Sequence, residues 1–142
     1  MSPLPRSATL RGLSSSRETG PLSNRDQHRW SRGNGGTSAN YEQARKQARA
    51  EGKQLFVEFS ASWCGPCQRM KQTTFTDSGV RDELSRYVEV FLDADSTRDL
   101  AQKFGIRGIP AYLVLTADET VILRGSGYRG PREFRTWLAG GG

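Results

Sequence analysis

The sequence predicts an α/β fold in which helices cover both faces of a central mixed β-sheet. Short apolar runs typical of strands alternate along the chain with segments whose apolar residues recur at helical spacing. Near the C-terminus two strand-like runs are separated only by residues 117–119, Ala-Asp-Glu, which predicts an antiparallel hairpin. A chain of 142 residues has room for one such domain and not for two.

The first half of the predicted domain contains a helix, a strand and two more helical segments. Asn40 is a candidate N-cap for a helix over residues 41–51. Residues 55–60 form an apolar run of strand length, and residues 64–72 favour a helix. Asp77 can cap a further helical segment, because apolar residues follow it at helical spacing: Val80, Leu84 and Tyr87.

The second half continues with a strand, a helix, the hairpin and a last helix. Residues 88–92 form a second apolar strand. Ser96, with Asp99 three residues later, resembles a capping box for a helix that ends near Phe104. The hairpin strands span 111–116 and 120–124, and a final helix begins at Pro131, a residue favoured at the first helical position.

The two cysteines of the chain, Cys64 and Cys67, lie where a strand is followed by a helix. The first turn of a helix presents unpaired N–H groups and the positive end of the helix dipole, and both stabilise a thiolate. We therefore expect the pKa of Cys64 to lie below the free value of about 8.5, which makes Cys64 the nucleophile. Cys67, one turn further along and less exposed, is placed to attack a mixed disulfide on Cys64. Gly65 permits the tight entry into the helix, and Pro66 lacks an N–H that the first turn would leave unused.

A zinc site and a purely structural disulfide are weaker readings of this cysteine pair. Zinc sites need about four ligands, but the chain has no second cysteine pair, and its one histidine, His28, lies far upstream. A disulfide across three positions closes a very small loop and constrains the chain little. The dithiol itself is then the redox group, and we expect neither a metal nor an organic cofactor.

Two segments resemble the thioredoxin family. Residues 59–67, FSASWCGPC, look like its active-site segment, and residues 103–110, KFGIRGIP, look like the segment that ends in a cis-proline facing the cysteines. The resemblance covers about residues 41–142 and implies the thioredoxin fold, a redox disulfide between Cys64 and Cys67, and thiol:disulfide oxidoreductase activity. Residues 72–80 are also similar to the C-terminal domains of membrane thiol:disulfide interchange proteins, which often deliver electrons in extracytoplasmic pathways.

The resemblance also implies a substrate groove beside the cysteines. Pro110 matches the cis-proline, and a cis bond would turn the backbone N–H and C=O of Ile109 toward a substrate strand. Gly127 resembles a glycine that lines this groove. Trp63 either covers part of the groove with its apolar body or packs within the domain. The predicted groove residues are Trp63, Gly65, Pro66, Ile109, Pro110 and Gly127. Arg107 and Arg129 either rim the groove and favour acidic partners or lie on a solvated surface.

Glu58 is the candidate proton carrier. Strand alternation places it on the opposite side from Val57 and Phe59. The position of Glu58 resembles that of a buried aspartate in thioredoxins, and that aspartate is thought to exchange a proton with the second cysteine. Burial would raise the carboxyl pKa toward neutrality, as a general base at pH 7 requires, whereas a Glu58 at the sheet edge would reach solvent. Phe91 occupies the position that resembles the family's partner lysine, so we expect no lysine beside Glu58.

Residues 1–39 differ in composition from the rest and are predicted to be a disordered extension of a domain over 40–142. They hold eight serines, five glycines and six arginines against two acidic residues. A secretory signal needs an apolar stretch of about 7–15 residues, which is missing, whereas arginine with serine is typical of transit peptides. A linker, an added extension and a start assigned too far upstream are further readings. The arginines are scattered, so we expect no nucleic-acid partner.

The remaining predictions concern the compartment and the partners. No apolar run approaches the roughly 18 residues that span a bilayer, so we expect no membrane insertion. A chain without structural disulfides fits a reducing compartment, hence the cytoplasm, with an organelle or the periplasm as alternatives. We expect a monomer that reduces protein disulfides and receives electrons from an upstream reductase. Two other functions stay open: a binding module of this fold without turnover, and a dimer whose Cys64 residues hold an iron–sulfur cluster.

Overall fold

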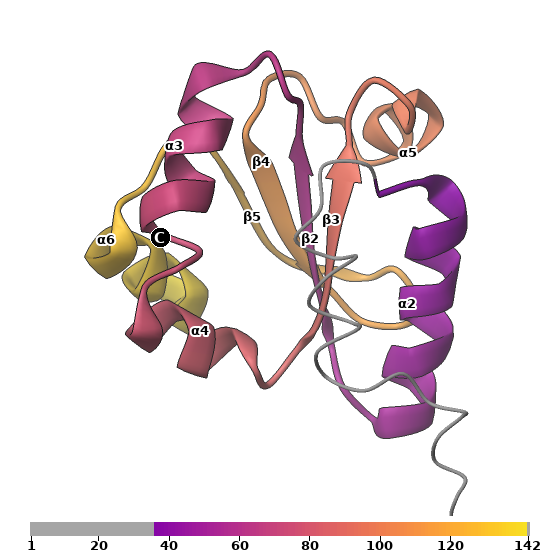
Figure 1. Ribbon diagram of the computed structural model, residues 1–142. Coiled ribbons are helices and arrows are strands. Elements are labelled where there is room, and N and C mark those ends of the chain that lie inside the picture. The colour runs from indigo at the N-terminus through magenta and orange to yellow at the C-terminus, as the bar shows by residue number, and fades with distance from the viewer. Residues whose placement is uncertain (1–35, 142) are drawn as a thin grey trace, which may run out of the picture.

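The computed structural model describes residues 36–141, so residues 1–35 of the predicted extension lie outside the described part. Helices and strands follow one another along it as predicted (Figure 1). The elements are α2 (Ser38–Glu51), β2 (Leu55–Ser60), α3 (Gly65–Thr73), α4 (Ser78–Leu84), β3 (Val88–Asp93), α5 (Arg98–Lys103), β4 (Ala111–Leu115), β5 (Val121–Ser126), α6 (Pro131–Thr136) and a π-helical turn, η2 (Trp137–Gly141).

Within residues 36–141 the strands form one four-stranded mixed sheet in the order β3-β2-β4-β5. β2 pairs with β3 in parallel and with β4 in antiparallel orientation, and β4 pairs with β5 in antiparallel orientation. The register sets Ser60 beside Asp93 and Ala111 beside Ser126, so the ends of three strands and the start of β4 meet at one end of the sheet. The loops that leave this end carry the candidate site.

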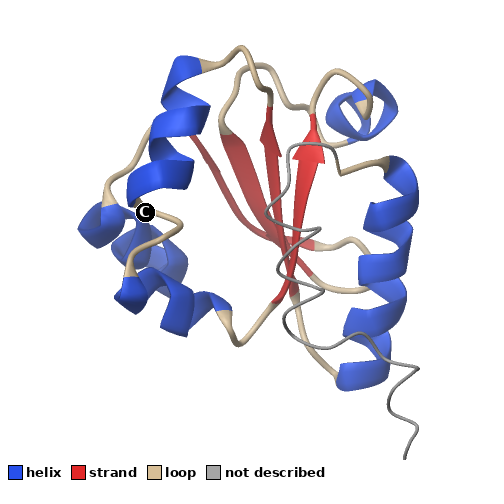
Figure 2. Cartoon of the chain, viewed as in Figure 1, coloured by secondary structure: helices blue, strands red, loops and turns tan. Residues whose placement is uncertain are grey.

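Two hydrophobic clusters cover the two faces of the sheet, because neighbouring strand residues point to opposite sides. Val57 and Phe59 of β2 pack in the cluster formed with α2 and α5, whereas Phe56 packs in the cluster formed with α3, α4 and α6. Figure 2 shows the same division, with helices in both outer layers and the strands between them. This arrangement confirms the predicted α/β class.

The N-terminus of α2 differs from its prediction. Thr37 and not Asn40 is the N-cap, so the helix begins at Ser38 rather than Tyr41. The Thr37 N–H donates to Asn40 Oδ1 at 2.8 Å, and the Asn40 N–H donates to Thr37 Oγ1 at 3.3 Å. This reciprocal pair is a capping box in which asparagine replaces the usual glutamate.

The predicted cap of α5 is also wrong, whereas the cap of α4 and the first residue of α6 are confirmed. Thr97 occupies the N-cap position of α5 and makes no side-chain cap bond, since its hydroxyl donates to the Asp93 carbonyl at 2.8 Å. Ser96 turns its hydroxyl toward the same carbonyl. Asp77 caps α4 by accepting the Val80 N–H at 3.0 Å, and Pro131 is the first residue of α6.

Candidate redox site

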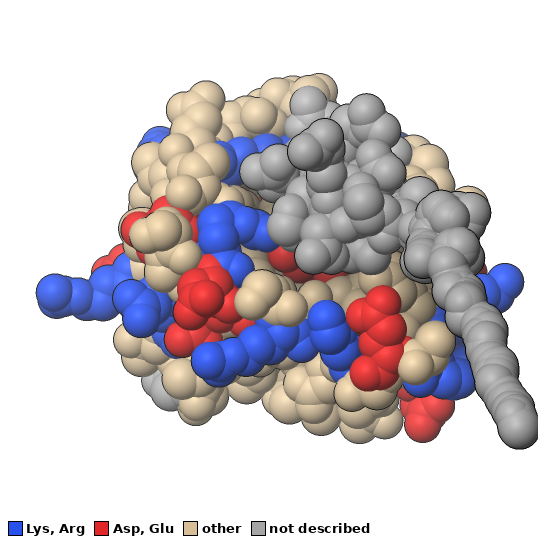
Figure 3. All heavy atoms as spheres, turned by 60° about the horizontal axis from the view of Figure 1, so that its bottom comes forward, with Lys and Arg blue, Asp and Glu red and all other residues tan. Residues whose placement is uncertain are grey.

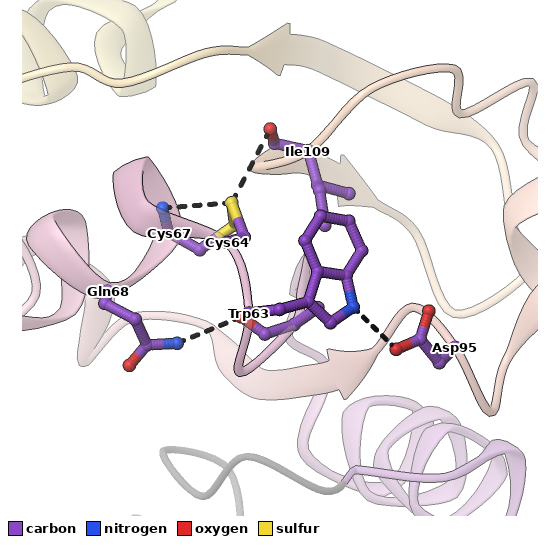
Figure 4. Close-up of a disulfide and its surroundings, with 7 residues drawn as sticks. Trp63, Cys64, Cys67, Gln68, Asp95 and Ile109 are labelled. Carbon is purple, nitrogen blue, oxygen red and sulfur yellow. Dashed lines mark hydrogen bonds between the residues drawn. A yellow bond between two sulfur atoms is a disulfide. The ribbon is translucent and has the colours of Figure 1, made fainter.

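Cys64 and Cys67 form a disulfide at the N-terminus of α3, with their Cα atoms 5.3 Å apart (Figure 4). Cys64 is the N-cap residue of the helix, and Gly65 and Pro66 lie in the first turn between the cysteines. Cys64 retains 5% of its surface and Cys67 none. The order of exposure is the one expected for a nucleophile and a resolving thiol.

Backbone groups surround the sulfur of Cys64. The Cys67 N–H donates to Cys64 Sγ at 3.2 Å, so an unpaired donor of the first helical turn points at this sulfur. The carbonyl oxygen of Ile109 lies 3.9 Å from the same sulfur, as Figure 4 shows. Gln68 steadies the preceding turn, because its side-chain amide donates to the Ala61 carbonyl at 3.0 Å. Negative charge on Cys64 Sγ is therefore favoured by a fixed donor.

The segment opposite the cysteines has the predicted backbone. The Ile109–Pro110 peptide bond is cis, and the Pro110 carbonyl accepts the Gly127 N–H at 2.8 Å. Gly127 has a φ of 84°, in the left-handed region that glycine adopts without strain, and its own carbonyl accepts the Tyr112 hydroxyl at 2.8 Å. These contacts bring Ile109, Pro110 and Gly127 together, and Ile109 connects them to Cys64.

Trp63 lies on the surface beside Cys64, with 68% of its surface exposed. Its indole N–H donates to Asp95 Oδ2 at 2.8 Å, and Figure 4 shows the ring between Asp95 and Ile109. Together with the loop before Pro110, Trp63 borders a largely apolar cavity of about 400 Å³. Such exposure fits the groove reading of Trp63 rather than packing within the domain. Asp95 was not singled out by the sequence, although it lies in the acidic turn after β3.

Glu58 lies wholly inside the protein, so the reading that it reaches solvent is wrong. It faces the same side of the sheet as Phe56, which is the side covered by α3. Neither carboxyl oxygen makes a hydrogen bond within residues 36–141. Burial raises the pKa of Glu58 to about 8. The Lys71 ammonium and the nearby Ser60 hydroxyl offset part of this rise.

The expectation that no lysine acts on Glu58 is wrong as well. Phe91 does lie beside Glu58 in the register of β2 and β3, as the sequence indicated. The charge comes instead from Lys71 on α3, four residues after Cys67 and therefore on the same side of the helix. Burial lowers the pKa of Lys71, while Glu58 and Asp93 act in the opposite direction. Lys71 thus interacts with two carboxyl groups, those of Glu58 and Asp93.

No group of three or more metal-ligating side chains comes together anywhere in residues 36–141. Over the same residues, no helix combines the length and the apolar character that crossing a membrane requires.

Comparisons with known proteins agree with this geometry. A model of the thioredoxin-like family matches residues 37–117. The chain is 34% identical over 109 residues to the thiol:disulfide interchange protein DsbD of Tatumella citrea, a match that covers 72% of this chain and 18% of that protein. It is 32% identical over 66 residues to thioredoxin-1 of Drosophila melanogaster, covering 46% of this chain and 60% of the relative. The chain thus spans less than two thirds of both relatives.

A solved structure has the same fold. The oxidised C-terminal domain of DsbD from Neisseria meningitidis superimposes with a TM-score of 0.64 at 21% identity, covering 78% of this chain and all of that domain. A fold of this type with a C-x-x-C pair at disulfide distance supports thiol–disulfide oxidoreductase chemistry. On its sequence match and its fold, the chain belongs to the thioredoxin-like family.

Proposed function

We propose that this protein is a thiol:disulfide oxidoreductase that acts mainly as a protein-disulfide reductase. One observation carries the proposal: Cys64 Sγ lies at a helix N-terminus, accepts the Cys67 N–H at 3.2 Å and lies 3.9 Å from the backbone of Ile109. The helix end favours a thiolate, and the Ile109 backbone offers a substrate chain main-chain hydrogen bonds. Recognition through backbone groups suits many different protein disulfides.

The proposed reaction has two exchange steps. In the reduced protein the Cys64 thiolate attacks one sulfur of the substrate disulfide, a bond forms between them, and the other substrate sulfur leaves as a thiolate that takes a proton from water. Cys67 then loses its proton and attacks Cys64 Sγ, which forms the Cys64–Cys67 disulfide and releases the second substrate thiolate. Two electrons pass to the substrate, and an external dithiol restores the reduced protein by the reverse exchange.

Glu58 is the proposed acceptor for the Cys67 proton. A carboxyl with a pKa of about 8 gains and loses its proton near neutral pH, as a general base at that pH must. Its place on the face of the sheet covered by α3 supports this role, since Cys67 belongs to that helix. Lys71 then acts as a positioning residue that keeps part of the Glu58 population ionised.

Reduction of insulin disulfides with a small dithiol as electron donor tests the proposal. The parent protein should accelerate the reaction, and Cys64→Ser should abolish the acceleration. Cys67→Ser should instead retain substrate as a covalent mixed disulfide, because the resolving thiol is missing. A parent that binds insulin chains without accelerating reduction would show a binding module. A brown protein with equimolar sulfide after expression with iron would show a cluster-bridging dimer.

Proposed partners follow from the same chemistry. We expect the substrates to be protein disulfides, the electron donor to be a dithiol protein, and the working form to be a monomer. Cys67→Ser expressed in its own cells would retain these partners covalently, and mass spectrometry would identify them.

A further inference from the structure

A second cavity lies on the other side of the loop that carries the cis-proline. Its volume is about 410 Å³, and three of its wall residues, Ile106, Arg107 and Gly108, also border the cavity beside Trp63. The remaining wall comes from the turn after α5, the start of β4, the end of β5 and the turn after β5: Gly105, Ala111, Arg124, Gly125, Ser126 and Arg129. The lining thus contains three arginines and no acidic residue. We call it the arginine pocket.

The three arginines lack a carboxylate partner within residues 36–141. The Arg124 guanidinium donates to the Phe104 carbonyl at 2.6 Å, and that of Arg129 donates to the Tyr112 hydroxyl at 2.6 Å, so their protein partners are neutral. Arg107 is exposed on the loop. Several other basic side chains lie close to acidic ones, as in the pair of Lys103 with Glu119, and Figure 3 shows both signs interspersed on the lower face of the molecule.

The Arg129 side chain is held in place before any ligand arrives. Its guanidinium lies over the rings of Tyr112 and Trp137, at 5.7 and 6.0 Å from their centres. Gly125 leaves the room for this packing, because a Cβ there would lie 2.7 Å from Tyr112 Cε2 and 3.0 Å from an Arg129 nitrogen. A guanidinium fixed in advance loses little freedom on binding, and its planar donors match the two oxygens of a carboxylate.

The position of the arginine pocket relates it to the cysteines. Gly108, in its wall, directly precedes Ile109, whose carbonyl lies 3.9 Å from Cys64 Sγ. A polypeptide paired with the Ile109 backbone therefore has the apolar cavity on one side of the loop and the arginine pocket on the other. In an unmodified polypeptide the groups that carry negative charge at neutral pH are the carboxylates of aspartate, of glutamate and of the C-terminus, and only the first two occur within the chain beside a cysteine.

We propose that the arginine pocket binds a carboxylate side chain of the substrate, so that the protein prefers disulfides flanked by acidic residues. This inference rests on the proposed reductase function and adds a substrate class to it. Charge-assisted hydrogen bonds to a guanidinium favour the acidic partner, and a preference of about tenfold in kcat/KM corresponds to about 1.4 kcal/mol, close to the lower end of the range for such bonds.

Two disulfide peptides that differ only in glutamate against glutamine beside the cysteine provide the test. The parent should reduce the glutamate peptide about tenfold more efficiently, by kcat/KM, than the glutamine peptide. Arg107 and Arg124 are exposed, so each can be replaced without disturbing the core. Arg107→Gln and Arg124→Gln, made as separate variants, should each bring this ratio toward one. Arg86→Gln is the matched control: it removes the same charge next to the opposite end of the sheet, before β3, and should keep the parent ratio.

The outcomes separate this inference from the proposed function. A parent that reduces both peptides equally well is a reductase without acidic preference, and the inference is overturned while the function stands. A ratio that falls as much in Arg86→Gln as in the pocket variants would show an effect of net charge, which also overturns the inference. If the parent reduces neither peptide, the proposed function fails and the inference fails with it.

Discussion

At the scale of single residues, the buried carboxyl of Glu58 sets the expected pH dependence of stability. Its pKa of about 8 in the folded protein lies above the unfolded value of 4.5. Below about pH 4.5 the carboxyl is protonated in both states and burial costs little. Between the two pKa values the unfolded chain ionises first, so the free energy of unfolding falls by at most about 1.4 kcal/mol per pH unit until the folded pKa is passed.

Glu58→Gln should remove this dependence while keeping the side-chain shape. Relative to the parent, the variant should gain stability between pH 5 and pH 8, because its amide has no proton to lose. Urea unfolding of the oxidised proteins at both pH values measures the difference. If the free energy of unfolding changed equally in the two proteins between pH 5 and pH 8, Glu58 would not titrate in this range. The same substitution should slow the release of mixed disulfides, which depends on the proton acceptor.

Lys71→Met should raise the pKa of Glu58 further. The Lys71 ammonium favours the ionised carboxyl and so lowers the Glu58 pKa, whereas burial raises it. Without the ammonium, the effect of burial on the pKa is less opposed. Titration of the Glu58 carboxyl carbon by NMR measures the shift. Lys46→Met is the control, since Lys46 is an exposed residue of α2, on the other side of the sheet. A Glu58 titration that is the same in parent and Lys71→Met would show that the ammonium does not act on it.

Cys64 should react with iodoacetamide faster than Cys67 in the reduced protein at neutral pH. Cys64 retains some exposed surface and its sulfur faces a helix N–H, whereas Cys67 is fully buried. Peptide mapping after brief labelling distinguishes the two sites. Preferential labelling of Cys67 would reverse the proposed roles of the two thiols.

The cysteines and Glu58 were recognisable from the sequence because each stands in a local pattern: the spacing of the thiols, and alternation along a strand. Lys71 was missed for the opposite reason. Lys71 interacts with Glu58 across the contact between α3 and the sheet. The position of α3 along the sheet and its rotation about its own axis cannot be read from the sequence. Only the spacing of four residues between Lys71 and Cys67 pointed to the right side of the helix.

At the scale of the elements, the entry into α2 shows where local rules stop. Thr37, Ser38 and Asn40 all favour an N-cap position, so the sequence offers several starts within a few residues. The choice depends on tertiary structure: Gly36 lies beside Leu92 of β3, and its carbonyl accepts the Asp93 N–H at 2.9 Å. That contact fixes the direction of the chain just before Thr37. The helix itself was predictable from its apolar spacing.

Thr37→Ala should lower the free energy of unfolding by about 1 kcal/mol, because the Asn40 N–H loses its acceptor at the start of α2. Ser38→Ala, one residue later, is the control and should change stability by less than about 0.5 kcal/mol, since its hydroxyl makes only a long contact to Asp99. Urea denaturation of the three proteins gives both values. Equal losses in the two variants would contradict the assignment of Thr37 as the cap.

At the scale of the whole molecule, the alternation of strands and helices was enough to predict a mixed sheet with two helical layers. The order β3-β2-β4-β5 was not predicted, because it depends on which strands become neighbours in space. The arginine pocket was predictable only in part. Arg107 and Arg129 were candidates for the rim of the groove, whereas Arg124 was missed, because the walls come from a loop, a strand end and a turn that are separated in the sequence. Sequence patterns of a few residues do not indicate which distant segments become neighbours in space.

Deleting residues 1–35 should leave the unfolding midpoint and the rate of insulin reduction nearly unchanged. Both hydrophobic clusters, the sheet and the disulfide are built within residues 36–141. The deletion stops before Gly36 so that the contact with β3 and the cap of α2 remain. Chemical denaturation and the insulin assay test this together. A loss above about 1 kcal/mol would show that the deleted segment contributes to the fold.

The position of β5 has a consequence for behaviour at high concentration. β5 is an outer strand of the sheet and pairs on one side only, with β4, within the described chain. Its first residues, Val121 and Ile122, are exposed, whereas Arg124 and Gly125 interrupt its other half. An open strand edge is a template for another chain, and charge and glycine discourage such pairing. We therefore expect aggregation, where it occurs, to start at Val121 and Ile122, and a lysine in place of Ile122 to delay it.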